Sequence, residues 1–170
     1  YYNSMMNLKQ QQRQYKDAIR AAKHYIEQTK ILNGRNSDQQ YHAYSKLCTL
    51  YALDNDSTRA FACLDSLKRG VGHSYQDKNV IANFYNVKGC CYRDFKKYEK
   101  AIACFDKAYK TLYDKRTEDS PSKFASLLNK SEAYFMLKRY DDAYATFSEY
   151  VETSRNKYGE TSGTYSQALF

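Results

Sequence analysis

The side chains best able to do chemistry in this sequence are its histidines and cysteines. They are His24, His42 and His73, and Cys48, Cys63, Cys90, Cys91 and Cys104. No histidine has a His or Cys neighbour at the spacing of about two to four residues that zinc ligands use. The sequence also lacks a phosphate-binding Gly-Lys-Ser/Thr motif and a Gly-x-Ser-x-Gly motif. We therefore predict a non-catalytic protein with no catalytic residue, metal site or cofactor, although residues distant in sequence could still meet in space.

A second candidate site is the acidic turn at residues 54–57, which reads Asp-Asn-Asp-Ser and resembles the start of a calcium loop. Such a loop needs Gly at its sixth position and a bidentate Glu at its twelfth. This chain has Arg59 and Asp65 at those positions. We therefore interpret the segment as a turn that caps a helix over residues 60–67.

The elements that must position any site are clearest in the middle of the chain. Two apolar stripes there have the three- and four-residue spacing of helices. The first contains Ile81, Phe84, Tyr85, Cys91, Tyr92 and Phe95, and the second contains Ala101, Ile102, Phe105, Ala108, Tyr109 and Leu112. Only residues 96–98 separate the stripes, which predicts a tight turn between two antiparallel helices.

Small residues are expected where two helices approach closely. Gly89 is the small residue of the first helix, and Ala101 and Ala108 are those of the second. We expect Gly89→Leu to cost about 1–3 kcal/mol by overpacking. Gly89→Ala should be nearly neutral, provided that a methyl group fits.

The same frame recurs along the chain. Ala18, Ala60, Ala101 and Ala143 are separated by 42, 41 and 42 residues. The central frame resembles the pattern of the tetratricopeptide repeat family, and the residues that match are Tyr85, Gly89, Tyr92, Tyr98, Ala101, Phe105 and Ala108. This resemblance implies an all-α fold, a right-handed solenoid of antiparallel helix pairs. The period is longer than the usual one of about 34 residues.

The repeats predict a single helical domain over residues 1–170. Its repeats would cover residues 1–36, 37–76, 77–119 and 120–162, and a further helix would start within 163–170. Ser followed by Pro at residues 120–121 predicts the start of a helix. Because the chain lacks an initial Met and its last residues have a new helical pattern, we expect it to be a piece of a longer protein.

The charge distribution bears on the class of partner. The chain has a net charge of +8, but its 27 Lys and Arg residues are interleaved with 19 Asp and Glu residues. A nucleic-acid platform needs a contiguous basic face with stacking aromatic groups, whereas helical spacing assigns most Tyr residues to packing. We therefore do not expect nucleic acid as the partner. No apolar run in this segment approaches the roughly 20 residues that a membrane span needs.

Cysteine usage bears on the compartment. Five cysteines are an odd number and a poor basis for disulfide pairing. Reduced thiols favour the cytoplasm. A periplasmic location stays open if the parent chain has a signal or anchor that was removed.

The family resemblance also suggests a binding surface, because the first helix of each pair in the family lines a concave groove that binds peptides. The candidate residues on these helices are His42, Ser45, Thr49, Asn83, Asn86, Cys90, Arg93, Leu128, Asn129, Glu132 and Phe135. Amides and a guanidinium suit a peptide's backbone and carboxylates. The alternative is that these residues are solvated or pack one repeat on the next. As exposed residues, Asn86 and Arg93 should tolerate Ala at a cost below about 0.5 kcal/mol.

These observations predict a non-catalytic scaffold that binds a protein or peptide. Repeats of this longer period resemble those of bacterial signalling and regulatory proteins, where they form the sensory or docking region. The alternatives are a basic solenoid that binds nucleic acid and a structural spacer between other domains.

Overall fold

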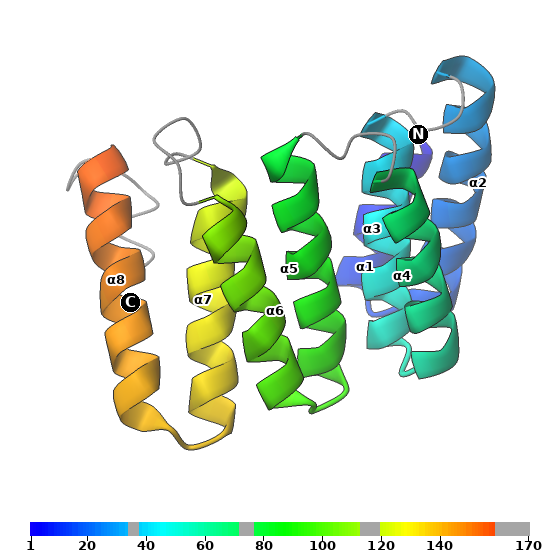
Figure 1. The fold of residues 1–170 in the computed structure, drawn as a ribbon. Coiled ribbons are helices and arrows are strands. Elements are labelled where there is room, and N and C mark those ends of the chain that lie inside the picture. The colour runs from blue at the N-terminus through cyan, green and yellow to red at the C-terminus, as the bar shows by residue number, and fades with distance from the viewer. Residues whose placement is uncertain (34–37, 72–76, 113–119, 159–170) are drawn as a thin grey trace. The chain divides into compact units, whose positions relative to one another are not determined.

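The computed structural model describes residues 1–33, 38–71, 77–112 and 120–158 (Figure 1). All secondary structure in these residues is helical. The helices are α1 (Tyr2–Gln11), α2 (Tyr15–Asn33), α3 (Asp38–Leu53), α4 (Ser57–Val71), α5 (Lys78–Asp94), α6 (Tyr98–Thr111), α7 (Pro121–Met136) and α8 (Tyr140–Tyr158). Short turns join them into antiparallel pairs, so the predicted all-α fold of stacked helix pairs is confirmed.

The chain divides into two compact units, Tyr1–Gln76 and Asp77–Phe170. In the first unit, α1 pairs with α2 and α3 pairs with α4, and α2 also packs against α3. Its buried core includes Met6, Ala22, Ile26, Leu47, Leu50, Leu64 and Leu67. Removing these apolar side chains from water is the main favourable term in folding the unit.

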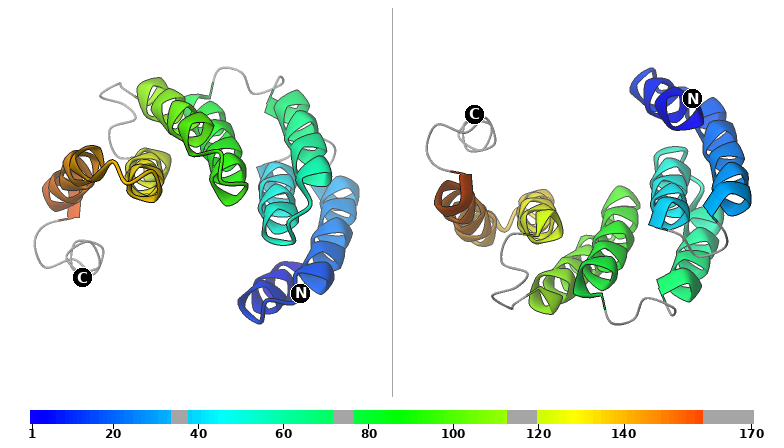
Figure 2. Two further views of the ribbon diagram at one scale, coloured as in Figure 1. Left: turned by 90° about the horizontal axis from the view of Figure 1, so that it is seen from below. Right: turned by 90° about the horizontal axis from the view of Figure 1, so that it is seen from above.

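In the second unit, α5 pairs with α6 and α7 pairs with α8. Helix α6 also packs against α7, and α5 contacts α7 directly, as the views from the helix ends show (Figure 2). One core cluster contains Ala101, Ile102, Phe105 and Ala133, and another contains Phe124, Leu127 and Tyr150.

The repeat register is confirmed by the four periodic alanines. Ala18, Ala60, Ala101 and Ala143 are each the fourth residue of the second helix in a pair, and all four are buried. A methyl group at this position lets the second helix lie close to its neighbours.

The turns inside the pairs follow the same register. Each contains one residue in the left-handed region, namely Arg13 (φ 56°), Asn55 (φ 59°), Lys96 (φ 58°) and Lys138 (φ 60°). In the central turn, the N–H of Lys97 donates to the carbonyl of Tyr92 at 2.8 Å, and the N–H of Lys96 donates to that of Arg93 at 2.8 Å. These bonds satisfy carbonyls at the helix end, as in a Schellman motif.

Two predicted helix starts are also confirmed. The Asp56 carboxylate accepts the N–H of Arg59 at 2.9 Å, so the acidic turn caps α4. Ser120 caps α7 by accepting the N–H of Ser122 at 3.3 Å, with Pro121 in the first turn.

The expectation for Gly89→Ala is wrong. A Cβ atom at Gly89 would lie 2.7 Å from Cδ1 and 2.8 Å from Cζ of the Phe105 ring. Phe105 is fully buried, so its ring cannot move aside without disturbing the core. Gly89 is therefore required by contact with an aromatic ring, and a methyl group does not fit.

Several expectations concern residues outside the described ranges. One of these is the further helix within 163–170. The predicted repeat boundaries fall mostly in the same segments, and the division into repeats stays a prediction.

Candidate functional site

The α5–α7 face of the second unit carries a row of polar contacts, which we call the ladder. Its α5 members, Asn79, Asn86 and Arg93, are seven residues apart and so share one helix face. The Ser120 hydroxyl donates to Asn79 Oδ1 at 2.6 Å. Asn86 Nδ2 donates to the Ser122 carbonyl at 2.7 Å, and Ser126 Oγ donates to Asn86 Oδ1 at 3.0 Å. The ladder therefore joins the two first helices of this unit along their length.

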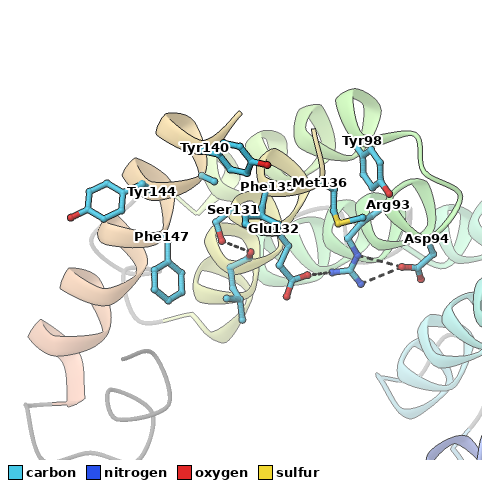
Figure 3. Close-up of a pocket in the computed structure, with 12 residues that line it drawn as sticks. Arg93, Asp94, Tyr98, Ser131, Glu132, Phe135, Met136, Tyr140, Tyr144 and Phe147 are labelled. Atoms are coloured by element: carbon cyan, nitrogen blue, oxygen red, sulfur yellow. Dashed lines mark hydrogen bonds and ion pairs between the residues drawn. The ribbon is translucent and has the colours of Figure 1, made fainter. Parts of the chain in front are cut away.

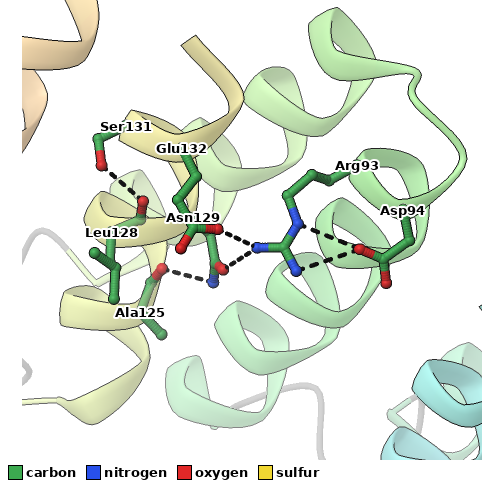
Figure 4. A network of polar contacts seen from close by, with 7 residues as sticks. All are labelled: Arg93, Asp94, Ala125, Leu128, Asn129, Ser131 and Glu132. Carbon is green, nitrogen blue, oxygen red and sulfur yellow. Dashed lines mark hydrogen bonds and ion pairs between the residues drawn. The ribbon is translucent and has the colours of Figure 1, made fainter. Parts of the chain in front are cut away.

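Arg93 forms the last step of the ladder (Figure 4). Its Nη1 donates to Asn129 Oδ1 at 2.7 Å and to Glu132 Oε2 at 2.6 Å. Its Nε and Nη2 donate to Asp94 Oδ1, each at 3.3 Å. Burial alone would lower the pKa of Arg93, but Cys90 and the neighbouring carboxylates more than offset this and raise it. The guanidinium is thus charged and shared among three side chains.

The ladder changes the interpretation of the predicted stripe in this unit. Asn86 is only 5% exposed, so the expectation that it is an exposed residue is wrong. The Arg93 side chain is 25% exposed and committed to three partners. Asn129 also donates to the carbonyl of Ala125 at 2.8 Å. For these residues, packing of one repeat on the next accounts for their polar groups.

Asn83 and Cys90 are both half-buried. Burial raises the pKa of the Cys90 thiol to about 11, although Arg93 lowers it in part. Cys90 is therefore a neutral thiol near pH 7 and a weak nucleophile. The other four cysteines are buried, as expected of small apolar side chains.

Beside the ladder, a pocket of about 800 Å³ opens between α7 and α8 (Figure 3). Of the predicted residues, it brings together Arg93, Leu128, Glu132 and Phe135. Its remaining lining residues are Asp94, Tyr98, Ser131, Met136, Tyr140, Ala143, Tyr144 and Phe147. Phe135 is 61% exposed and Tyr144 is 77% exposed. Sequence reasoning did not single out the tyrosines, because their spacing matched that of core residues.

A second, polar pocket of about 350 Å³ lies in the first unit between α1, α2 and α3. Its polar lining residues are Asn3, Asn7, Tyr25, Gln39, His42 and Lys46. His42 is thus the predicted residue that reaches this pocket. The Ser45 hydroxyl donates to the Tyr41 carbonyl at 3.0 Å, and the Thr49 hydroxyl donates to the Ser45 carbonyl at 3.2 Å. These two predicted residues use their hydroxyl protons within α3.

The described residues also bear on metal sites and on membrane spans. In the described parts of the chain, His, Cys, Asp and Glu side chains form no group of three or more that could hold a metal ion. Among the same residues, no helix combines the length and the hydropathy that crossing a membrane requires.

Comparison with known protein families identifies one of the repeats. Residues 82–111, which contain most of α5 and all of α6, match the tetratricopeptide repeat family. The chain carries a tetratricopeptide repeat. A comparison with curated proteins finds no match.

Solved structures show the same tetratricopeptide-like fold. BtubC (BKLC) from P. vanneervenii has a TM-score of 0.75 and 18% identity, over 88% of this chain and 61% of that chain. A putative kinesin light chain from Podosopora anserina, with nearly identical TPR-like repeats, has a TM-score of 0.69 and 11% identity, over 98% of this chain and 80% of that one. The present chain thus spans about three-fifths of the length of the first structure. At these identities the likeness shows the fold alone.

Proposed function

We propose that this chain is a non-catalytic scaffold that binds an extended, acidic segment of a partner protein in the polar pocket of the first unit. Tetratricopeptide repeats generally mediate protein–protein interaction, which supports the general role. The observation that carries the specific proposal is a set of uncommitted polar groups on the α1–α3 face.

Several polar side chains of this pocket have donors and acceptors that no other described residue uses. In the described part of the chain, the side chains of Asn3, Asn7, Gln39 and Lys46 make no hydrogen bond or ion pair. The Oε1 atom of Gln10, on the same helix as Asn3 and Asn7, is buried and has no partner in the described parts of the chain. A buried acceptor without a donor costs about 1–3 kcal/mol, although Gln10 is not among the residues that line the pocket.

The chemistry of these groups fits a peptide backbone. An extended peptide offers alternating N–H and C=O groups, and an Asn or Gln side chain can both donate and accept. Lys46, with His42 beside it, adds donors that suit a carboxylate. The first 40 residues carry seven basic and three acidic side chains, a balance of +4 that favours an acidic partner.

The proposal extends to the protein's context. The period of 41 to 42 residues supports a role as the sensory or docking region of a larger bacterial signalling or regulatory protein. A cytoplasmic location stays a prediction that rests on the odd number of cysteines.

The test uses the intact 170-residue chain. Short peptides are selected on it from a random display library, and the Kd of the best fluorescein-labelled peptide is measured by anisotropy. Lys46→Ala and Asn7→Ala should each weaken binding by about 5- to 150-fold, equivalent to about 1–3 kcal/mol. Binding should also weaken as salt is raised, since carboxylate contacts are screened.

Lys110→Ala is the matched control, because Lys110 is an exposed lysine in the last turn of α6. It should leave the Kd unchanged. Equal losses for Lys46→Ala and Lys110→Ala would show nonspecific charge attraction and contradict the pocket. A labelled single-stranded oligonucleotide that binds more tightly than any peptide would favour the nucleic-acid alternative, and failure to select a peptide would favour the spacer.

A further inference from the structure

A basic pocket of about 270 Å³ lies in the first unit, between α2, the turn after α3 and the first turn of α4. Four of its lining side chains are cations and one is an anion, a balance of +3. It shares no lining residue with the α1–α3 pocket, so the proposed function does not use it. The residues that line it are Lys16, Ile19, Arg20, Lys23, Asp54 and Arg59.

Helix α2 arranges three of the cations in one row. Lys16, Arg20 and Lys23 follow the spacing i, i+4, i+7, which places them on one helix face. The row is about 10 Å long, at a rise of about 1.5 Å per residue. Ile19 lines the same pocket but is only 7% exposed, so it forms an apolar floor between the charged groups.

The cations differ in how firmly other residues hold them. Arg59 is held by the carboxylate that caps α4, which accepts from its Nε at 2.5 Å. Arg20 meets Asp17 at 3.4 Å, and such exposed pairs contribute little. In the described part of the chain, the side chains of Lys16 and Lys23 make no hydrogen bond or ion pair. Two ammonium groups and a loosely held guanidinium are therefore available to an anion.

The charge and size of the pocket fit a phosphoryl group on a side chain. Such a group carries a charge of about −1.5 to −2 and three acceptor oxygens, which suit a cluster of Lys and Arg donors. Small-molecule sites usually measure about 300–1,000 Å³, so this pocket has room for a group but not for a whole nucleotide. The described residues that line it include no aromatic ring on which a base of single-stranded nucleic acid could stack.

We propose that this pocket binds a phosphorylated Ser or Thr side chain of a partner protein. The phosphoryl group lies over Ile19, where Arg20 and one of the two lysines donate to its oxygens. The row of cations is longer than one phosphoryl group, so the second lysine meets an acidic residue two or three positions away in an extended partner segment. Asp54 repels the anion and limits the affinity. This inference is independent of the α1–α3 pocket.

The test uses the intact 170-residue chain, immobilised and screened with a peptide library that has phosphoserine fixed at its centre and random flanks. The Kd of the best fluorescein-labelled phosphopeptide is then measured by anisotropy. It should be lower than the Kd of the unphosphorylated form of the same peptide by about tenfold or more, because the phosphoryl group accepts charged hydrogen bonds. Equal Kd values for the two forms, or a screen that enriches no phosphopeptide, would overturn the proposal.

Substitutions assign the binding to the pocket. Arg20→Gln and Lys23→Gln should each weaken phosphopeptide binding about tenfold, since each removes a charged donor. Asp54→Asn should tighten binding several-fold, because it removes the acid from the lining. Lys110→Gln, at an exposed lysine of α6, is the control and should leave the Kd unchanged. Circular dichroism verifies that every variant is folded, and equal losses in Lys23→Gln and Lys110→Gln would overturn the proposal.

Three further results would also overturn it by identifying another ligand or another site. Inorganic phosphate that binds as tightly as the phosphopeptide would identify a free anion as the ligand. A labelled single-stranded oligonucleotide that binds more tightly than the phosphopeptide, and is weakened by Lys23→Gln, would assign the pocket to nucleic acid. Phosphopeptide binding that is lost in Lys46→Ala but kept in Lys23→Gln would place the ligand in the α1–α3 pocket and leave the proposed function intact.

Discussion

The α1–α3 face of the first unit and the α5–α7 face of the second are built from equivalent positions, 83 residues apart. Asn3, Asn7 and Gln10 correspond to Asn86, Cys90 and Arg93, while Gln39, Ala43 and Lys46 correspond to Ser122, Ser126 and Asn129. The second face is closed by hydrogen bonds between its helices. The first holds an open pocket, in which the side chains of Asn3, Asn7, Gln39 and Lys46 make no hydrogen bond or ion pair within the described residues.

A difference of one hydroxyl group illustrates why the second face is closed by hydrogen bonds and the first is not. Ser126 donates to the Asn86 side chain, whereas its counterpart Ala43 has nothing to donate to Asn3. At the far step, Arg93 donates to Asn129, whereas no such bond joins Gln10 to Lys46 in the part of the chain that the structure describes. A polar residue at a groove position is therefore available to a ligand only when the facing helix lacks its partner.

The cores of the two units place the larger residue of one packed pair on opposite helices. Gly89 lies against Phe105 in the second unit. The equivalent positions in the first unit are Met6 and Ala22, both buried. The large residue is on the first helix in one unit and on the second helix in the other, so the pair of positions keeps roughly the same volume.

The largest expected effect comes from replacing the Gly89–Phe105 pair with the Met–Ala pair of the first unit. Gly89→Met should lower the free energy of unfolding by about 3 kcal/mol through overpacking against Phe105. Phe105→Ala should cost about 3–5 kcal/mol by leaving a cavity. The double variant should lose clearly less than the sum, because Met and Ala reproduce the pair in the first unit. Urea unfolding measures all three, and additive losses would show that the two positions are not complementary.

The next effect separates the closed face from the open one. Asn86→Ala should cost about 1–3 kcal/mol, because it removes two hydrogen bonds and leaves buried partners unsatisfied. Asn3→Ala, at the equivalent exposed position, should cost less than about 0.5 kcal/mol. Thermal unfolding of both variants under one set of conditions makes the comparison, and similar losses would remove the distinction between the two faces.

A smaller effect concerns the charge next to the ladder. Burial raises the pKa of the Asp94 carboxyl more than Arg93 lowers it. A carboxyl with a raised pKa in the folded state binds its proton more tightly there, so its contribution to stability falls as the pH rises through that pKa. Asp94→Asn should therefore gain stability relative to the native chain over that interval, by less than about 1 kcal/mol. Unfolding measured across the acidic range tests this, and a change in the opposite direction would mean that the Arg93 pairing dominates.

The smallest effect tests the shared turn. Lys96 adopts φ 58°, which Gly accepts without steric cost. Lys96→Gly should raise the free energy of unfolding by a few tenths of a kcal/mol, since the gain is partly offset by the larger entropy of Gly when unfolded. Lys97→Gly, at the neighbouring position with negative φ, is the control and should not stabilise the protein. Equal effects would show that the turn conformation is not the cause.

The sequence by itself determined the local architecture. Helical spacing located the helix pairs, Ser followed by Pro located the start of α7, and the alanine period located four equivalent second helices. These features follow from the sequence because they depend on neighbours within one or two helical turns. The small residue at position 89 was recognised for the same reason.

The tertiary structure alone decided which residues of the candidate stripe are available. Asn86 and His42 looked alike as polar residues on a first helix, yet one is buried in the ladder and the other is exposed beside a pocket. Whether a methyl group fits at Gly89 depended on where the Phe105 ring lies. Each outcome depends on contacts with residues on another helix, most of them 16 to 40 positions away, and no local pattern records their distance or orientation.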